Sequence, residues 1–325
     1  MNADVDSEAI ARELRDAVLE LRSQLGRRFV GQEGLVDNVI AAILAQGHVL
    51  LEGGPGLGKT LLVKLVAKFL GLRVQRIQFT PDLMPSDILG GQILETTSEG
   101  PTTRFEPGPI FTQVLLADEI NRANPRTQSA MLEAMAEGQV TLGGQTQKLE
   151  TPFFVLATNN PIEMEGTYPL PEAQADRFLL KVVVNSPDRN TLVRILDVRP
   201  DDALDTAEPI LNATALTAFQ GHVRQLPTST RIKELIADLI LLTQPDPTSS
   251  DSRKWIKLGA SPRAAQGLLA ASKARAAMSG RLHVIEDDVR AMVPETLSHR
   301  LVLDYGARVG GIGPGDVVAD ILKRV

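Results

Sequence analysis

Hydrophobic residues recur at helical spacing near the beginning of the chain. Five of them follow one another at intervals of four, four, three and four residues: Ile10, Leu14, Val18, Leu21 and Leu25. This spacing places all five on one face of an α-helix, so it predicts an amphipathic helix. A second apolar pattern of helical period runs from residue 35 to residue 44. We therefore expect two helices, each with one buried side, before the first strand.

Beyond residue 44, short apolar runs alternate with helical patterns. The runs have the length of buried strands and lie at residues 48–52, 74–79, 113–117, 153–158 and 181–184. Between them, one helical pattern ends at Gly71 and another begins at Asn124-Pro125 and ends at Gly138, which are typical residues for helix ends. Apolar strands that alternate with helices are typical of a parallel sheet covered on both faces. The pattern predicts an α/β fold.

Two segments interrupt this alternation, and the last part of the chain departs from it. Residues 88–111 are rich in Gly, Thr and Pro, whereas residues 139–149 place two glycines between alternating polar residues, which predicts a hairpin. From residue 186 to residue 325 we find helical patterns and loops without a convincing buried strand. The sequence therefore predicts two domains, residues 1–185 and a smaller all-helical domain at 186–325.

Composition narrows the class of protein. Of 325 residues, 43% are hydrophobic and 23% are charged, as in a globular protein that buries a core. The chain has no cysteine, which excludes disulfides and cysteine-ligated metals, and its four histidines lack a metal-binding spacing. A formal charge of -6 argues against nucleic acid as a partner. Because no apolar run approaches 18 residues and residues 1–6 are acidic, we expect no membrane insertion, no signal peptide and a cytoplasmic location.

A glycine-rich motif follows the apolar run at 48–52. The pattern G-x-x-x-x-G-K-[ST] is matched by Gly53, Gly54, Pro55, Gly56, Leu57, Gly58, Lys59 and Thr60. Its glycines let backbone N–H groups turn toward phosphate oxygens, which a Cβ atom would obstruct. Lys59 is expected to reach the β- and γ-phosphates, and the Thr60 hydroxyl is expected to bind Mg²⁺. The motif predicts ATP and Mg²⁺ as cofactors, and we include the next residue, Leu61, among the nucleotide-binding residues.

Two carboxylates end the apolar run at 113–117. Asp118 and Glu119 stand at the C-terminal end of the predicted strand, where open α/β sheets bind their ligands. Asp118 can hold Mg²⁺, and Glu119 can polarise a water for in-line attack on the γ-phosphorus. An acidic pair often merely ends a strand. After a phosphate-binding loop, however, this pair indicates an ATPase rather than a nucleotide kinase.

The run at 153–158 is followed by Asn159-Asn160-Pro161. An asparagine at this strand end can hydrogen-bond both the γ-phosphate and the attacking water. The same three residues are also typical of a turn, and that alternative stays open. Of the two amides, we favour Asn160 as the residue that contacts the γ-phosphate.

The strand and helix order, the acidic pair and the asparagine-ended strand resemble the AAA+ ATPases. Four stretches are very similar to the MoxR family within them: FTPDLMPSDI at 79–88, FEPGPIF at 105–111, DEINRA at 118–123 and EGTYPLPEAQ at 165–174. The resemblance covers nearly the whole chain, from Val30 to Val325. It implies a P-loop NTPase domain of AAA+ type, with a parallel sheet flanked by helices, at 1–185 and a helical lid domain at 186–325.

The resemblance also implies roles for segments around the nucleotide. Val30, Gly31 and Gln32 would lie against the adenine base. Residues 88–111 correspond to the helix-2 insert of the family, and residues 139–149 correspond to the hairpin before the sensor-1 asparagine. Both segments would project toward the pore or face of a ring. The family commonly has Gln at the position of Asn159, so the sequence departs from the family pattern there.

Two arginines are assigned through the same resemblance. Arg177 resembles the arginine finger that reaches the ATP of a neighbouring subunit. Arg263 resembles the sensor-2 arginine of the lid, which touches phosphate in its own subunit. A planar, permanently charged guanidinium suits the charge spread over the γ-phosphate oxygens in the transition state. Arg122 and Arg126, which follow the acidic pair, could also face a neighbour.

The family resemblance implies an ATP-hydrolysing, chaperone-like machine. Such machines are usually hexameric rings of identical subunits that mature or activate partner proteins, often proteins with von Willebrand factor A domains. Three alternatives stay open: a DNA motor, a magnesium-chelatase-like motor subunit, and a nucleotide-gated scaffold that binds ATP without turnover. The predicted hairpin argues against DNA, because Lys148 is its only cation and it has no aromatic residue for base stacking.

Overall fold

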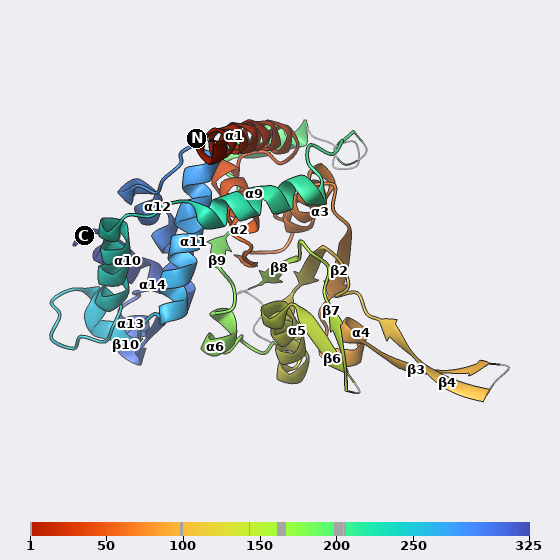
Figure 1. Ribbon diagram of the computed structural model, residues 1–325. Helices are drawn as coiled ribbons and strands as arrows, with labels where there is room; N and C mark the ends of the chain where they lie inside the picture. Colours follow the sequence, from red (N-terminus) through yellow and green to blue (C-terminus); the bar gives the residue numbers. More distant parts are fainter. Residues whose placement is uncertain (1, 98–99, 143, 161–166, 198–203, 205) are drawn as a thin grey trace.

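A five-stranded parallel sheet forms the centre of the first domain (Figure 1). The computed structural model describes residues 2–97, 100–142, 144–160, 167–197, 204 and 206–325. In spatial order the strands are β2 (Val74–Gln78), β5 (Val114–Asp118), β8 (Phe154–Asn159), β1 (Val49–Glu52) and β9 (Leu180–Val183). All neighbouring pairs run parallel, so the predicted parallel sheet is confirmed.

Each face of the sheet has its own hydrophobic core. Successive residues of a strand point to opposite faces. Accordingly, Leu51 and Leu156 belong to one buried cluster, while their neighbours Leu50 and Val155 belong to another. The first cluster includes residues of α1 (Asn2–Arg28), α2 (Glu33–Leu44) and α3 (Lys59–Phe69), and the second includes residues of α4 (Pro85–Leu89) and α5 (Pro125–Glu137). Helices therefore cover both faces, as predicted.

The predicted ends of α3 and α5 are confirmed. Gly71 follows α3 with a φ of +61°, in the left-handed region that glycine adopts without strain. Before α5, Asn124 Oδ1 accepts hydrogen bonds from the backbone N–H groups of Arg126 and Thr127, each at 3.1 Å. Gly138 ends this helix with a φ of +63°. These local signals position the helix that follows the acidic pair.

Two antiparallel hairpins lie outside the central parallel sheet. β6 (Gln139–Leu142) pairs with β7 (Gln145–Lys148), which confirms the predicted hairpin. Within segment 88–111, β3 (Gly90–Thr97) and β4 (Gly100–Pro107) form a longer hairpin that projects away from the body of the molecule (Figure 1). Gly90 has a φ of +84°, and a Cβ there would lie 2.1 Å from the Glu106 carbonyl oxygen, so this hairpin requires glycine at its base.

Helices dominate the part of the chain after β9, as predicted. In the described part of the chain after β9, the helices are α7 (Arg189–Leu196), α9 (Ala213–Gln225), α10 (Thr230–Leu242), α11 (Pro262–Met278), α12 (Glu286–Leu297), α13 (Tyr305–Val309) and α14 (Pro314–Leu322), with the 3₁₀ segments η2 (Ser252–Trp255) and η3 (Ser298–Arg300). The short helix α6 (Glu172–Ala175) and the 3₁₀ segment η1 (Ile120–Arg122) precede β9 and belong to the first domain. Two short strands, β10 (Ile256–Leu258) and β11 (Val302–Leu303), also pair with each other. The prediction of an all-helical domain is corrected by these two strands, which are too short, at two or three residues, for a recognisable period.

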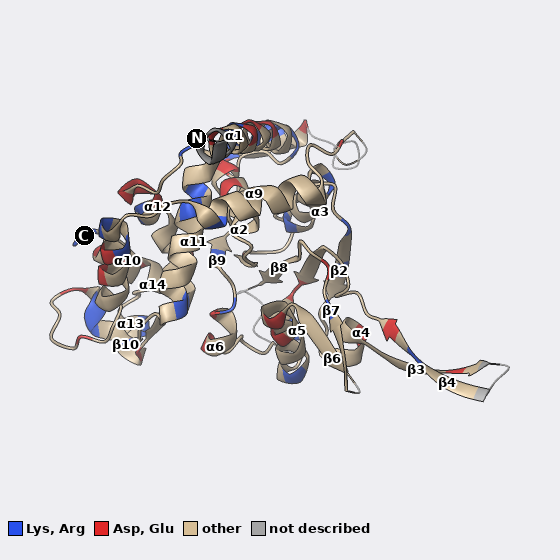
Figure 2. Ribbon diagram, in the orientation of Figure 1, with Lys and Arg blue, Asp and Glu red and all other residues tan. Residues whose placement is uncertain are grey.

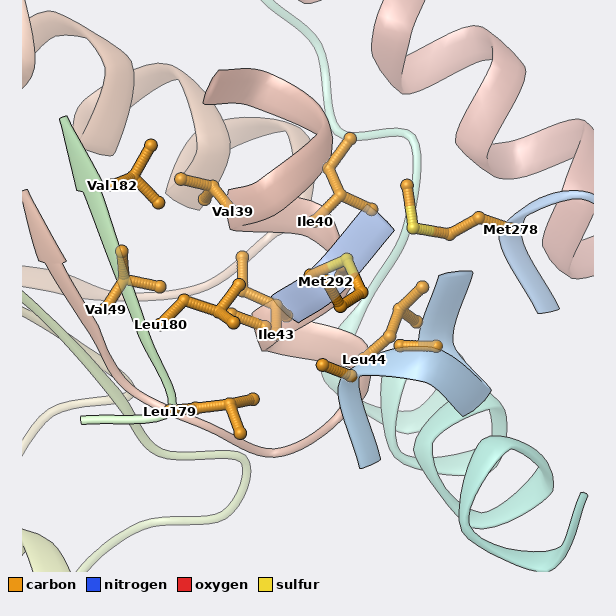
Figure 3. Close-up of a cluster of buried hydrophobic side chains, with 14 of the residues drawn as sticks. Val39, Ile40, Ile43, Leu44, Val49, Leu179, Leu180, Val182, Met278 and Met292 are labelled. Carbon is orange, nitrogen blue, oxygen red and sulfur yellow. The ribbon is translucent and has the colours of Figure 1, made fainter. Parts of the chain in front are cut away.

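Helix α2 connects the sheet with the helical part. Figure 3 shows side chains of α2 gathered with residues of β1 and β9 and with methionines of α11 and α12 in one buried cluster. Helix α11 packs against α1, α2 and α9. One continuous core therefore runs from the first face of the sheet into the helical part. The domain boundary near residue 186 stays a prediction.

Charged residues are interspersed over both parts of the molecule. In the view of Figure 2, positions of both signs are distributed over both parts of the molecule. Within the described ranges, no helix combines the length and the apolar character needed to cross a membrane.

His48, just before β1, makes the fold sensitive to acid. Its Nδ1 accepts a hydrogen bond from the Val155 N–H group at 3.0 Å, and its Nε2 lies 3.3 Å from the Met135 carbonyl oxygen. Burial lowers the pKa of His48 to about 4, although the contact with Met135 opposes the shift. A protonated imidazole has no acceptor left for Val155. Protonation of His48 therefore breaks this contact.

The pH dependence of unfolding tests this role of His48. The folded-state pKa lies below the value of 6.5 for a free histidine. The unfolded chain therefore binds more protons between these values, and stability falls as the pH drops from 6.5 to 4, by about 3 kcal/mol for this residue. His48→Asn keeps an acceptor for Val155 and is expected to remove that loss. Urea unfolding at neutral and acidic pH measures the difference. An equal acid-induced loss in wild type and variant would contradict the assignment.

Candidate nucleotide-binding site

The glycine-rich loop lies between β1 and α3, at the C-terminal edge of the sheet. Lys59 Nζ donates hydrogen bonds to the carbonyl oxygens of Gly53 at 2.6 Å and Gly54 at 3.0 Å. Burial lowers the pKa of Lys59, and the negative charges of Asp118 and Glu119 oppose that shift. The sheet therefore brings the lysine and the acidic pair close enough for their charges to interact.

The backbone of this loop fits a phosphate group. Gly56 and Gly58 have φ values of +75° and +77°, which residues with a Cβ rarely adopt. A Cβ at Gly53 would lie 2.7 Å from the Val184 carbonyl oxygen, and one at Gly58 would lie 2.9 Å from the ring of Phe29. Gly58 caps α3 without a side-chain hydrogen bond, so the first N–H groups of this helix are available for an anion. Glycine is thus required at these positions of the motif.

A cavity of about 270 Å³ adjoins the loop. It is lined by the predicted residues Val30, Gln32, Leu57 and Leu61, together with the loop glycines Gly56 and Gly58. Its apolar walls suit the face of a purine base. Two of the three residues expected to lie against adenine, Val30 and Gln32, therefore line this cavity.

Helix α7 forms the other wall of this cavity, which the sequence did not predict. Leu192 and Ile195 line it, with relative exposures of 50% and 39%. Gly31 has a φ of +81°, and a Cβ there would lie 2.2 Å from the side chain of Thr191. Glycine at this position lets α7 pack closely over the segment before α2. The signal in the sequence is the set of apolar residues in the short segment RNTLVRIL, and the structure shows that none of them is buried.

Thr158 joins the two carboxylates that follow β5. Its hydroxyl donates a hydrogen bond to Asp118 Oδ1 at 2.6 Å and accepts one from the Glu119 N–H group at 2.8 Å. Glu119 has a φ of +57°, a left-handed conformation that costs about 1–3 kcal/mol for a residue other than glycine. Thr158 thus holds a strained backbone at the acidic pair, where strain is typical of functional sites.

Side chains of β2 contact both carboxylates, and the sequence analysis missed them. Arg76 forms an ion pair with Asp118 Oδ2 at 2.7 Å, and Gln78 Nε2 donates to Glu119 Oε2 at 2.8 Å. Arg122 also contacts Glu119 Oε2, at 2.9 Å. Arg76 and Gln78 are two residues apart and therefore share a face of the strand. The alternation of residues 74–79 could be recognised in the sequence. Only the pairing of β2 with β5 places Arg76 and Gln78 beside the two carboxylates.

The donor set at this edge fits a magnesium ion bound together with phosphate. Mg²⁺ usually takes one or two protein oxygens and completes its coordination with phosphates and water. Thr60 lies in the first turn of α3, and Asp118 ends β5 across the loop. Within the described residues there is no group of three or more metal-ligating side chains. Thr60 and Asp118 would therefore hold Mg²⁺ only with ATP bound.

Asn159, the last residue of β8, and Asn160, which follows it, lie beside a second cavity, of about 580 Å³. Asn159 Nδ2 donates a hydrogen bond to Glu52 Oε2 at 3.3 Å. The same oxygen forms an ion pair with Lys181 Nζ at 2.8 Å. Asn160 is buried, and its carbonyl oxygen lies 3.4 Å from Asn121 Nδ2. The preference for Asn160 stays a prediction. Residues 161–166, which include the start of EGTYPLPEAQ, lie outside the described residues.

The two predicted arginines are linked through Asp176, which precedes Arg177 and lies near Arg263. Arg177, between α6 and β9, is half-buried, and its Nη1 donates to the Leu132 carbonyl oxygen of α5 at 3.2 Å. Arg263 begins α11, is 55% exposed, and lies 3.9 Å from the carboxylate of Asp176. The contacts described for Arg263 thus place it beside the residue preceding Arg177. Its role in binding phosphate of its own subunit stays a prediction.

Comparison with known proteins agrees with this geometry. The model of the ATPase family associated with various cellular activities (AAA) matches residues 48–180, and that of the AAA lid domain matches residues 249–321. The chain is 42% identical over 304 residues to the uncharacterized protein YeaC of Bacillus subtilis (strain 168), covering 93% of this chain and 92% of YeaC. It is 41% identical over 317 residues to the chaperone MoxR1 of Mycobacterium tuberculosis, covering 96% and 81% of the two chains.

A crystal structure supports the same relationship. The protein comes from Cytophaga hutchinsonii and is described provisionally as an ATPase. It matches this chain with a TM-score of 0.90 and 34% identity, over 100% of this chain and 99% of the other. Sequence and fold agree over almost the full length, and the chain belongs to the MoxR family of AAA+ ATPases.

Proposed function

We propose that this protein hydrolyses ATP to ADP and phosphate and uses the reaction to remodel or activate partner proteins. The observation that carries the proposal is the convergence of Lys59, Asp118 and Glu119 at one sheet edge, where their charges interact. The lysine belongs to a loop with glycines at positions of positive φ or close contact, and the acids stand at the end of β5, which is separated from β1 in the sheet by β8. This is the set of groups that ATP hydrolysis requires.

Each residue has a distinct part in the proposed reaction. Lys59 binds the β- and γ-phosphate oxygens, and Thr60 and Asp118 hold Mg²⁺, which neutralises charge on the phosphates when it is bound. Glu119 orients a water and accepts its proton. Asn160 hydrogen-bonds the γ-phosphate beside that water. Bound phosphate would also replace the carbonyl oxygens of Gly53 and Gly54 as partners of the lysine.

We further propose a ring of identical subunits, with six as the expected number. Arg177 is the finger that reaches the ATP of the next subunit, and Arg263 is the lid arginine. The exposed apolar residues of the β3–β4 hairpin, Ile93 and Leu94, give the ring a surface for a protein client. The similarity to a chaperone supports a protein client, such as one with a von Willebrand factor A domain. A DNA client is disfavoured, because Lys148 is the only basic residue on the described part of β6 and β7.

The dependence of ATPase activity on protein concentration tests this proposal. An isolated subunit lacks the finger of its neighbour and should hydrolyse ATP slowly. Specific activity is therefore expected to rise at least about tenfold as the chain is concentrated through its assembly range, in parallel with the mass measured by light scattering. A specific activity that stays constant while the mass increases would contradict the finger in trans.

A further inference from the structure

A buried arginine holds the turn between α6 and β9. Arg300 ends η3, and its side chain is 3% exposed. Its Nε donates to Asp176 Oδ1 at 2.6 Å, and its terminal nitrogens donate to the carbonyl oxygens of Asp176 at 3.1 Å, Phe178 at 2.8 Å and Leu179 at 3.2 Å. The remaining N–H group donates to the Thr296 carbonyl oxygen. All five N–H groups of the guanidinium therefore have acceptors, four of them in residues 176–179.

This turn is the backbone that carries Arg177. Phe178 is fully buried in the core on the second face of the sheet, and Leu179 is buried in the core on the first face. His299 adds a further contact, because its Nε2 lies 3.1 Å from the Phe178 carbonyl oxygen. The backbone on both sides of Arg177 is thus fixed to η3. The turn cannot shift relative to Arg300 without breaking several buried hydrogen bonds.

The same turn is also attached to the first residues of α11. Asp176 Oδ2 accepts a hydrogen bond from Ser261 Oγ at 3.2 Å, and Arg263 lies 3.9 Å from the same oxygen. Ser261 is the residue before the first turn of this helix. One carboxylate therefore contacts both η3 and α11. The turn that carries Arg177 is therefore attached to two elements of the helical part as well as to the sheet.

We infer that Arg300 is a positioning residue for Arg177, because its hydrogen bonds hold the backbone at 176–179 against η3 of its own subunit. The inference rests on the proposed function, in which Arg177 acts on the ATP of the neighbour. The turn is fixed from two sides, by the cores of the sheet and by η3 and α11, so the finger is held in one position. The joint between Arg300 and Asp176 thereby sets where the finger meets the next site of the ring.

Two conservative variants separate this role from simple stabilisation. Arg300→Lys keeps the charge but loses the planar set of five donors. Asp176→Asn keeps an oxygen acceptor at a position that is partly exposed, so it tests the same joint even if Arg300→Lys fails to fold. The matched control is Arg281→Lys, because Arg281 forms a two-bond ion pair with Asp288 inside the lid, away from residues 176–179.

The expected result is a loss in turnover without a loss in binding. Arg300→Lys and Asp176→Asn should each lower kcat by about 10- to 100-fold, the effect expected for a misplaced catalytic group. The affinity of Arg300→Lys for a fluorescent ATP analogue should stay within about threefold of wild type, since the finger of a subunit does not contact its own nucleotide. Asp176→Asn is assessed by kcat alone, because Asp176 also lies 3.9 Å from Arg263. Arg281→Lys should leave kcat within about twofold. Wild-type kcat in a folded Arg300→Lys or Asp176→Asn protein would overturn the inference.

A double-mutant cycle provides a readout that a structural role alone would not change. In the background of Arg177→Ala there is no finger left to misplace, so adding Arg300→Lys or Asp176→Asn should lower kcat by less than about twofold. If the added variant lowers kcat by the same factor in the wild-type protein and in Arg177→Ala, the inference is overturned. If Arg177→Ala itself hydrolyses ATP at the wild-type rate, the finger in trans and this inference both fail. If Arg177→Ala is slow while both joint variants are normal, only this inference fails.

Discussion

Glu119→Gln is expected to slow ATP hydrolysis by about 10²- to 10⁴-fold while the protein continues to bind ATP. Glutamine has the shape of glutamate, but its amide cannot accept a proton from the attacking water. The residues assigned to phosphate and Mg²⁺ are unchanged in this variant. Single-turnover release of phosphate, measured beside the affinity for ATP, separates the two effects. The expected result is a complex with bound ATP that is cleaved only slowly.

The matched control for this prediction is Glu133→Gln, which makes the same chemical change at an exposed position of α5. It should hydrolyse ATP at the wild-type rate. Wild-type hydrolysis by Glu119→Gln would contradict the role of Glu119. Negligible turnover by the wild-type ring itself would instead favour the scaffold that binds ATP without using it.

The side chain of Glu119 is held by two neighbouring side chains in this structure. Gln78 and Arg122 both contact Glu119 Oε2, at 2.8 and 2.9 Å. These contacts satisfy the carboxylate and leave its other oxygen, Oε1, for a water. Asp118 has other partners, since it forms an ion pair with Arg76 and accepts a hydrogen bond from the Thr158 hydroxyl. The two neighbouring acids can therefore perform different tasks.

Removing the finger is expected to have the second large effect. Arg177→Ala should lower kcat by about 10³- to 10⁵-fold, the range for arginine fingers supplied in trans. Binding of ATP should change little, because the finger stabilises charge that develops on the γ-phosphate in the transition state. Arg177→Lys should recover only a small part of the lost kcat, because an ammonium group lacks the planar fork with which a guanidinium contacts two phosphate oxygens. Steady-state ATPase assays at saturating ATP measure both variants.

A mixture of two inactive variants tests whether Arg177 acts between subunits. Glu119→Gln subunits keep the finger, and Arg177→Ala subunits keep the water-orienting carboxylate. In rings assembled from equal amounts of both, about a quarter of the head-to-tail interfaces combine an intact Glu119 with an intact Arg177. Activity should therefore return on mixing. A mixture as inactive as its components, with mixed rings shown by mass, would contradict the action in trans.

The sheet and its neighbouring helices could be predicted because their signals are local. Apolar runs of four to six residues marked the five parallel strands, and glycine or asparagine marked the ends of α3 and α5. The phosphate loop was readable for the same reason, since its glycines are required by positive φ values and close contacts within the loop. Such features need no knowledge of which segments pair in space.

The remaining features of the site depend on contacts between distant segments. Arg76 and Gln78 meet the acidic pair only because β2 lies next to β5, and strand order is not encoded in local hydrophobic pattern. Arg300 contacts residues 176–179 across more than a hundred positions of sequence. Its burial contradicts the usual preference of arginine for the surface. Only the fold shows that these residues belong to the site.

The proposed function depends on the binding of ATP in the loop that ends at Lys59. Isothermal titration calorimetry with ATP in the presence of Mg²⁺ tests it most directly, with Lys59→Met as the matched variant that keeps the aliphatic stem and removes the ammonium. Wild type is expected to bind ATP, and the variant is expected to bind it at least about a hundredfold more weakly, the cost of losing a charge-assisted contact to phosphate. Absence of ATP binding by the wild-type protein under these conditions would contradict the account.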